Sequence, residues 1–95
     1  MKFPESAFEY DEINYELVSP KMRIPLSTDY HNLMMCFLAT PNKVVPMENL
    51  LKAVAGDNNK LRVYISHLRE NFRLMESLVE IENKHNKGYV LKVKL

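Results

Sequence analysis

The stretch from Asn58 to Met75 carries arginines and small polar side chains at helical spacing, and this set could bind a nucleic-acid duplex. A guanidinium group can donate two parallel hydrogen bonds to a phosphate or to a guanine edge. Asparagine and serine can hydrogen-bond to base edges or to phosphate oxygens. On one helix face the residues of this kind are Asn59, Arg62, Ser66, Arg69 and Arg73. The alternative interpretation is an ordinary solvated face, because most surface helices carry such residues.

The opposite face of the same stretch is apolar. Large apolar side chains recur every three or four residues, at Leu61, Ile65, Leu68, Phe72 and Met75. This spacing is typical of a helix with one buried stripe. The sequence therefore predicts a helix over residues 58–75 that buries this stripe and directs its arginines to solvent.

Two further helices are expected before it, which completes a three-helix core over residues 28–74. The first begins at Ser27 or Thr28, either of which can cap it, and ends before Pro41. The second has Pro46 in its first turn and ends at Gly56. The apolar faces of the two helices consist of Tyr30, Leu33, Met34, Phe37, Leu38, Met47, Leu50, Leu51 and Val54. Because the connector to the third helix is short, the second and third helices form a helix-turn-helix arrangement.

Residues 1–26 predict a small antiparallel sheet. Residues 8–10, 14–18 and 22–26 are short segments with an extended pattern, and in the last two apolar residues alternate with polar neighbours as in half-buried strands. Residues 19–21 suit a turn. Pro25 has no backbone N–H for a ladder, so the last strand lies at an edge or ends there.

Residues 78–95 predict a β-hairpin with a basic tip. Val79 and Ile81 alternate with glutamates, and the returning strand carries its apolar alternation at Tyr89, Leu91, Val93 and Leu95. Residues 83–88 form the tip. Gly88 is one of only two glycines in the chain, so we expect it to meet a backbone requirement at the end of the turn.

The net charge of +1 argues against a protein that binds any nucleic acid by bulk electrostatics, but the charge is unevenly distributed. Residues 1–16 carry one lysine and five acidic residues, whereas residues 57–95 carry eight basic and five acidic residues. The single Cys36 has no partner for a disulfide, which fits a core position and a reducing compartment. Neither a signal peptide nor a membrane span is recognisable, so we expect a cytoplasmic chain.

Catalytic and metal chemistry are not expected. The three histidines, His31, His67 and His85, fall on separate predicted elements and lack neighbours at ligand spacing. Ser66 and His67 are adjacent on one helix, so their side chains diverge and cannot act as nucleophile and base. Two glycines are too few for a phosphate-binding loop. The sequence therefore indicates no enzyme, no cofactor and no metal site.

The order of these elements resembles the OmpR/PhoB-type winged-helix DNA-binding domain, an α+β fold. The matching words are IPLS before the first helix, NKVVPMENLL at the second, LRVYISHLR at the third and GYVL at the end of the hairpin. The resemblance extends from about Tyr15 to Val93, and LRVYISHLR is most similar to the ToxR/CadC-like branch. It implies a single winged-helix domain over residues 1–95, with N-terminal strands, a three-helix core and a hairpin wing.

The resemblance also implies how such a domain binds double-stranded DNA. The third helix would enter the major groove through Asn59, Tyr64, Ser66, His67 and Arg69, and the wing would reach the minor groove through Asn83, His85 and Tyr89. To these we add Arg62 and Arg73 from the helix face, and Lys84, Lys87 and Lys92 from the charge of the wing. Members of the family often bind direct repeats as head-to-tail dimers. In some members the loop between the second and third helices contacts RNA polymerase.

Several positions depart from the family pattern. An acidic residue is usual at Tyr30, a tryptophan at Ala55 and basic residues near Glu70 and Asn71, while the wing usually carries arginine and glycines at the positions of His85 and Asn86. The small Ala55 predicts a repacked core. The lowered positive charge leaves a second hypothesis open, in which the fold is a protein-interaction module that uses its acidic N-terminal edge.

Arg69 is the strongest single candidate for a DNA contact, because the helix face and the family position agree on it. The alternative for Arg69 is an ion pair with Glu70 or Glu76. Tyr89 has a comparable alternative as a packing residue at the base of the hairpin.

Overall fold

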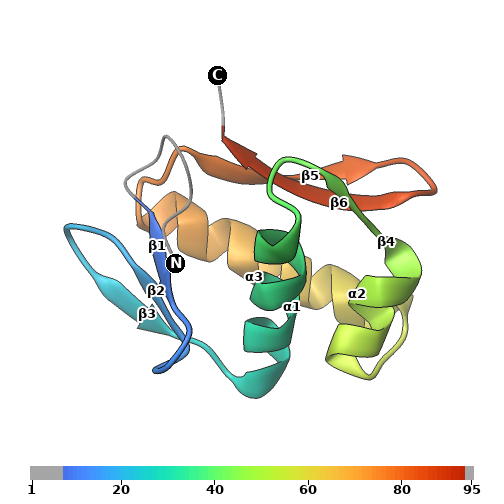
Figure 1. Cartoon of the computed structure of the whole chain (residues 1–95), viewed down its shortest axis with the longest axis horizontal. Coiled ribbons are helices and arrows are strands. Elements are labelled where there is room, and N and C mark those ends of the chain that lie inside the picture. Colours follow the sequence, from blue (N-terminus) through green and yellow to red (C-terminus); the bar gives the residue numbers. More distant parts are fainter. Residues whose placement is uncertain (1–7, 94–95) are drawn as a thin grey trace.

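The computed structural model describes residues 8–93, which form three helices and two small antiparallel sheets (Figure 1). In chain order the elements are β1 (Glu9–Asp11), β2 (Glu16–Val18), β3 (Arg23–Pro25), α1 (Thr28–Ala39), β4 (Val44–Pro46), α2 (Met47–Val54), α3 (Asn58–Leu74), β5 (Val79–Lys84) and β6 (Gly88–Val93). The predicted order of strands, three helices and terminal hairpin is confirmed. Leu95 and the first seven residues of the predicted N-terminal segment lie outside the described residues.

The N-terminal sheet has the strand order β1-β2-β3, and both pairings are antiparallel. Tyr10 and Leu17 face each other in its register and are fully buried. Ser19 closes the turn between β2 and β3, where its N–H donates to the Met22 carbonyl at 2.9 Å. Pro25 is the last residue of the edge strand β3, as predicted, so no ladder bond is lost.

The side chain of His31 joins the N-terminal sheet to α1. Its Nδ1 shares a hydrogen bond with the hydroxyl of Tyr10, and its ring stacks on that of Tyr15 with 3.7 Å between centroids. Burial raises the pKa of Tyr10 to about 12. Ser27 occupies the N-cap position of α1, but its side chain makes no capping bond, which differs from the expectation.

The helix α2 ends earlier than the sequence predicts. Its last residue is Val54, and Ala55 adopts the left-handed conformation at φ 49° and ψ 50°. The N–H of Gly56 bonds back to the Leu51 carbonyl at 3.3 Å, which closes the helix end. Ala55 is exposed, so its own side chain is not part of the core. A core packed differently from that of family members with a tryptophan here stays a prediction.

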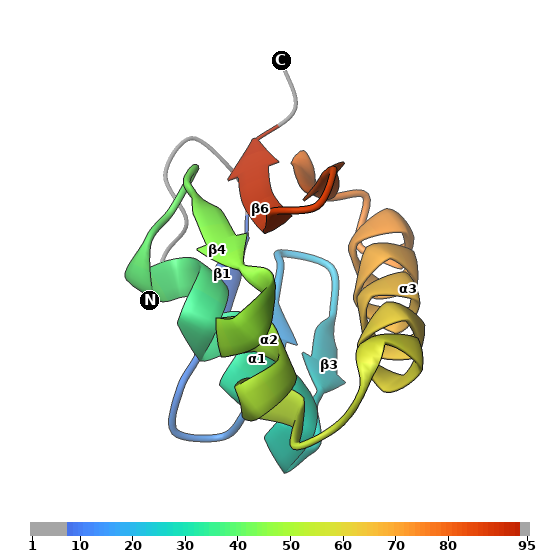
Figure 2. The same cartoon turned by 90° about the vertical axis from the view of Figure 1, so that its right-hand side faces the viewer.

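The helix α3 begins and packs as the apolar stripe predicts. The Asp57 carboxylate accepts a hydrogen bond from the Lys60 N–H at 2.9 Å, which caps the helix. All five residues of the stripe are buried: Leu61, Ile65, Leu68, Phe72 and Met75. Figure 2 shows α3 along one side of the molecule and α1 with α2 along the other, with the second sheet over one end.

The terminal hairpin is part of a three-stranded sheet in the order β4-β6-β5. The strand β4 is not among the predicted elements, because a segment of three residues is too short to show a period. Val45 is 4% exposed and faces Tyr89 in the register of β6, whereas Val44 is 38% exposed. Pro46 therefore ends an edge strand and precedes α2 instead of lying in its first turn.

Gly88 is required where β4 meets the hairpin. It pairs with Pro46 and has φ 154°, a backbone conformation that L side chains rarely adopt. A Cβ added there would lie 1.9 Å from the carbonyl oxygen of Val45. The expected backbone requirement is therefore confirmed, and its cause is the close approach of a third strand.

Replacing Gly88 by alanine should lower the free energy of unfolding by roughly 2 to 4 kcal/mol, because the strand pairing must separate to admit the methyl group. Gly56→Ala is the matched control. A Cβ there meets only the flexible side chain of Lys60, at 2.5 Å from Cδ, so the loss should be much smaller. Urea denaturation of both variants measures the difference, and equal losses would contradict this explanation.

Candidate nucleic-acid interface

The predicted polar face of α3 is exposed along its whole length. Asn59, Arg62 and Ser66 lie on it toward the start of the helix, and Arg69 and Arg73 toward its end. Sequence analysis missed Val63, which is 50% exposed on this side. Val63 lies four residues after Asn59 and three before Ser66, and residues at these spacings share a helix face. This spacing could have placed Val63 on the polar face from the sequence. An exposed apolar group here could contact a thymine methyl group.

The start of α3 and the tip of the wing border one hollow of about 460 Å³. Arg62 lines it from the helix, and Asn83 and His85 line it from the hairpin. The full lining is Met47, Asn58, Leu61, Arg62, Asn83, His85, Asn86 and Tyr89. Three residues predicted separately from helix and wing thus lie around the same depression. Asn58 is an additional polar group that sequence analysis did not select.

Tyr89 forms part of the floor of this hollow. It is 5% exposed and belongs to the core cluster, in the central strand β6. The structure therefore agrees with its alternative role as a packing residue, and little of its side chain can reach a ligand.

Arg69 holds the wing against α3. Its Nε and one terminal NH2 donate to the backbone carbonyl of Ile81 in the edge strand β5, at 3.1 and 2.9 Å. The guanidinium carbon lies 5.9 Å from the ring centroid of Tyr89. The alternative ion pair is wrong, because Glu70 bonds Arg73 and Glu76 bonds Lys21. Two of the three guanidinium nitrogens are thus engaged within the protein.

Tyr64 and His67 are directed toward α1. The Tyr64 hydroxyl donates to the Asp29 carboxylate at 2.9 Å, which raises the pKa of Tyr64. The Tyr30 hydroxyl hydrogen-bonds Nδ1 of His67, and the rings of Tyr30 and Tyr64 are 4.5 Å apart. Lys60 adds an ion pair to Asp29 at 3.5 Å. These contacts join α3 to α1, while the His67 side chain stays exposed.

The remaining cations of the interface differ in whether they have an acidic partner. Arg73 bonds both oxygens of Glu70, a contact that lowers the pKa of Glu70. Lys84 and Lys92 both bond Glu82, and these contacts lower its pKa to about 2. Within residues 8–93, Arg62 and Lys87 form no ion pair, and Arg62 bonds only the side chain of Asn59, at 3.3 Å.

Nowhere between residues 8 and 93 do three His, Cys, Asp or Glu side chains gather in a way that could hold a metal ion. Over the same residues, the helices are too short or too polar to cross a membrane.

The helices α2 and α3 form a helix-turn-helix, and the polar face of α3 is exposed. A β-hairpin follows and packs beside α3. This arrangement defines the winged-helix class of domain. The chain belongs to the family described as "Transcriptional regulatory protein, C terminal", whose model matches residues 21–91. This confirms the resemblance to the OmpR/PhoB type.

The transcriptional regulatory protein DltR of Streptococcus agalactiae is 32% identical over 83 residues, which cover 82% of this chain and 37% of DltR. The chain thus spans little more than a third of the length of this relative.

Solved structures of the same fold include DNA-binding domains. The domain of the response regulator AdeR, in complex with an intercistronic region, matches with a TM-score of 0.77 and 17% identity over 92% of this chain and 95% of that one. The DNA-binding domain of Escherichia coli CadC matches with a TM-score of 0.79 and 19% identity over 92% and 87% of the two chains. At these identities the comparison establishes the fold.

Replacing Arg69 by alanine should loosen the wing. The variant loses two charge-assisted hydrogen bonds to Ile81, and we expect a loss of about 1 kcal/mol in unfolding free energy with faster amide exchange in β5. Arg62→Ala is the control, because it removes the same side chain from the same helix face without a wing contact. Hydrogen exchange followed by NMR distinguishes them. The assignment fails if β5 exchanges at the same rate in both variants.

Proposed function

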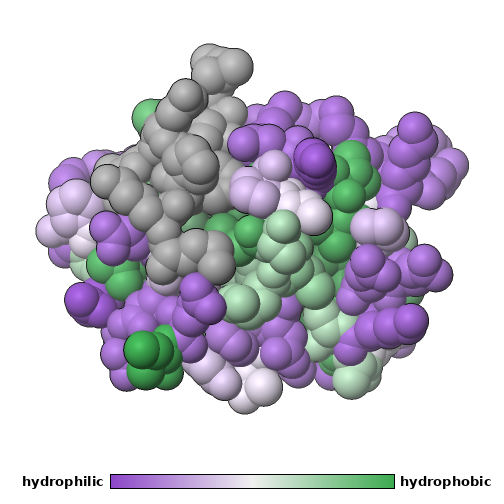
Figure 3. Space-filling model, in the orientation of Figure 1, coloured by the Kyte–Doolittle hydropathy of each residue, from purple (hydrophilic) through white to green (hydrophobic). Residues whose placement is uncertain are grey.

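We propose that this domain binds double-stranded DNA for a transcriptional regulator, with α3 in the major groove and the wing beside the adjacent minor groove. The observation that carries the proposal is the shared hollow between α3 and the wing tip, which arranges Arg62, Asn83 and His85 on one surface. Family membership supports it, and favours it over the protein-interaction module. Figure 3 shows hydrophilic side chains over the end of the molecule where the wing tip and α2 lie.

Phosphate contacts in this proposal come first from the cations without an acidic partner. Arg62 projects from α3, and Lys87 lies in the tight turn of the wing, where its N–H bonds the Lys84 carbonyl at 2.9 Å. Such contacts fix the position of a protein on the duplex without reading sequence. The other cations of the interface already bind a carboxylate, and these are Arg73, Lys84 and Lys92. Each of them can contact a phosphate only after the phosphate displaces that carboxylate.

Base contacts in this proposal come from residues 59–69 of α3, because a major groove about 12 Å wide admits one helix. Asn59 and Ser66 supply hydrogen bonds, and Val63 supplies an apolar surface. Arg69 retains one terminal nitrogen for a base or a phosphate, and His67 retains Nε2. Tyr64 and Tyr89 act indirectly, by holding the helix and the wing in place.

The proposal assigns binding and not catalysis to the domain. Two of the three histidines, His31 and His67, each share a hydrogen bond with a tyrosine hydroxyl, which fits structural roles. We also place the domain in the cytoplasm, where a transcriptional regulator meets DNA. The loop between α2 and α3 is only residues 55–57, and Asp57 caps α3, so we base no RNA polymerase contact on it.

Fluorescence anisotropy with a random duplex, titrated from low to physiological salt, tests DNA binding. The logarithm of the affinity should fall linearly with the logarithm of the salt concentration. Arg62→Ala and Lys87→Ala should each weaken binding severalfold and reduce the slope by about 0.9, the share of one phosphate contact. Arg23→Ala, which removes the same charge from the N-terminal sheet, should change neither. Absence of binding at low salt would refute the proposal.

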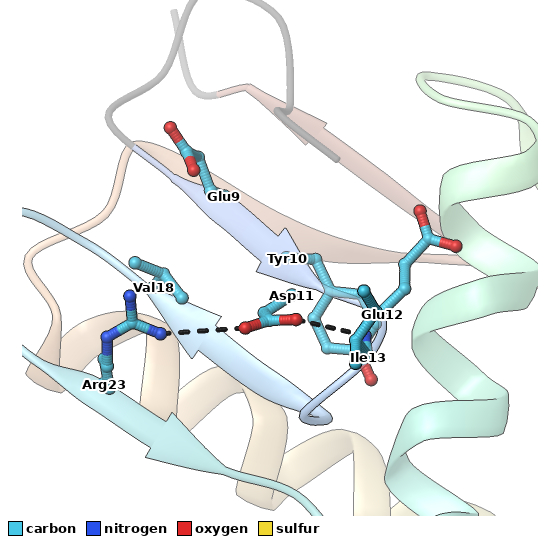
Figure 4. Close-up of a pocket in the computed structure, with 7 residues that line it drawn as sticks. All are labelled: Glu9, Tyr10, Asp11, Glu12, Ile13, Val18 and Arg23. Carbon is cyan, nitrogen blue, oxygen red and sulfur yellow. Dashed lines mark hydrogen bonds and ion pairs between the residues drawn. The ribbon is translucent and has the colours of Figure 1, made fainter.

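A head-to-tail dimer on direct repeats is part of the same proposal, and the charges of the two ends support it. The outer side of the N-terminal sheet is acidic, with Glu9, Asp11 and Glu12 around a shallow pocket that only Arg23 offsets (Figure 4). Arg23 lies 3.7 Å from the Asp11 carboxylate. Ile13, in the turn beside them, is 90% exposed. This acidic surface is complementary in charge to the wing tip of a second copy.

Charge reversal tests the dimer through the cooperativity of binding to a selected direct-repeat duplex. Glu12→Lys should reduce cooperativity severalfold, because it cancels the net negative charge of this surface and places a lysine opposite the basic wing tip. Adding Lys87→Glu to the same chain restores opposite charges and should recover part of the cooperativity. The cooperativity of each variant is measured relative to its own affinity for a single site, because Lys87 is also a proposed phosphate contact. Glu48→Lys, a reversal on α2, is the control. Cooperativity that is unaffected by Glu12→Lys would exclude this interface.

A further inference from the structure

Two glutamates on the proposed DNA-binding surface already bind three of its cations. On α3, the Glu70 carboxylate accepts from Arg73 through both oxygens, and the Nε contact is 3.0 Å long. On the wing, Glu82 uses one oxygen for Lys84, at 2.6 Å, and the other for Lys92. Both oxygens of each carboxylate are therefore occupied by groups that would otherwise face phosphate.

The two carboxylates hold their cations by the same interaction that a DNA phosphate would use. Arginine binds carboxylate and phosphate with the same two-pronged geometry, and lysine binds either as a point charge. The side chains of Arg73 and Glu70 are 68% and 53% exposed, so DNA could reach this pair directly. Exposed pairs of this kind are weak and exchange easily. A phosphate can therefore displace the carboxylate, but each displacement reduces the net gain from the contact.

We propose that Glu70 and Glu82 compete with DNA phosphates for Arg73, Lys84 and Lys92, and thereby set the sequence-independent part of the DNA affinity. The inference rests on the proposed function. Binding to arbitrary duplexes depends almost entirely on phosphate neutralisation, so this competition limits it directly. Operator binding also draws on base contacts from α3, which the carboxylates do not oppose. The two glutamates thus determine how much of the affinity comes from base reading.

Glutamine variants test the competition, because they keep the size of the side chain and remove its charge. Glu82→Gln frees Lys84 and leaves Lys92 with only its longer contact to Glu80, at 3.8 Å. It should raise affinity for a random duplex on the order of tenfold at ~0.1 M salt and steepen the salt slope by ~0.9 to ~1.8. Glu70→Gln frees one arginine and should steepen the slope by up to ~0.9. Glu16→Gln is the matched control, because Glu16 pairs with Arg23 on the N-terminal sheet and its loss changes the net charge equally.

The outcomes separate this inference from the function on which it rests. A steeper salt slope in Glu82→Gln and Glu70→Gln, but not in Glu16→Gln, supports the competition. Binding that appears only in the double variant Glu70→Gln/Glu82→Gln also supports it. If the unmodified domain binds DNA and all variants share its slope, the competition is overturned while DNA binding stands. If neither the unmodified domain nor the double variant binds at low salt, both are overturned.

Discussion

The helix α3 buries Leu61, Ile65 and Leu68 completely and leaves Phe72 only 2% exposed. Burial of each such side chain stabilises the fold by about 1.5 to 3 kcal/mol, so four of them contribute about 6 to 12 kcal/mol, which is comparable to the whole stability of a small domain. Rotation of α3 about its own axis would expose this stripe and unfold the protein. The orientation of the polar face is therefore fixed by the core, and every other feature of the interface depends on it.

The wing is positioned by contacts at both of its edges. On one side β4 packs its backbone against Gly88, and on the other Arg69 bonds the outward carbonyl of Ile81 in β5. An unpaired strand edge presents free backbone groups, and an arginine that caps one of them also covers the edge against pairing with another chain. Arg69, the strongest candidate from the sequence for a DNA contact, thus connects the two surfaces of the proposed interface.

The sequence predicted elements whose signals are local. The helical period of the apolar residues in α3 and the alternation of apolar and polar residues in β5 can each be recognised within a short stretch of sequence, and the structure contains both elements. The strand β4 was missed because its pairing with β6 joins Val45 to Tyr89, which are far apart in sequence. The sequence also did not predict the hydrogen-bond and ion-pair acceptors of three long side chains, Arg69, Tyr64 and Lys92, for a related reason. Side chains of this length choose among several acceptors, and only the folded arrangement decides which acceptor is nearest.

Burial divides the polar contacts of the domain into two groups with different consequences. The Tyr64 bond to Asp29 and the Tyr10 bond to His31 are partly buried, so water competes poorly for them and they keep α1, α3 and the N-terminal sheet in register. The pairs of Glu70 and Glu82 lie on the surface, where screening and hydration make them weak. A domain built in this way can exchange the partners of its surface cations without disturbing its helices. Recognition then costs rearrangement of a few side chains, while the positions of α3 and the wing stay as the core sets them.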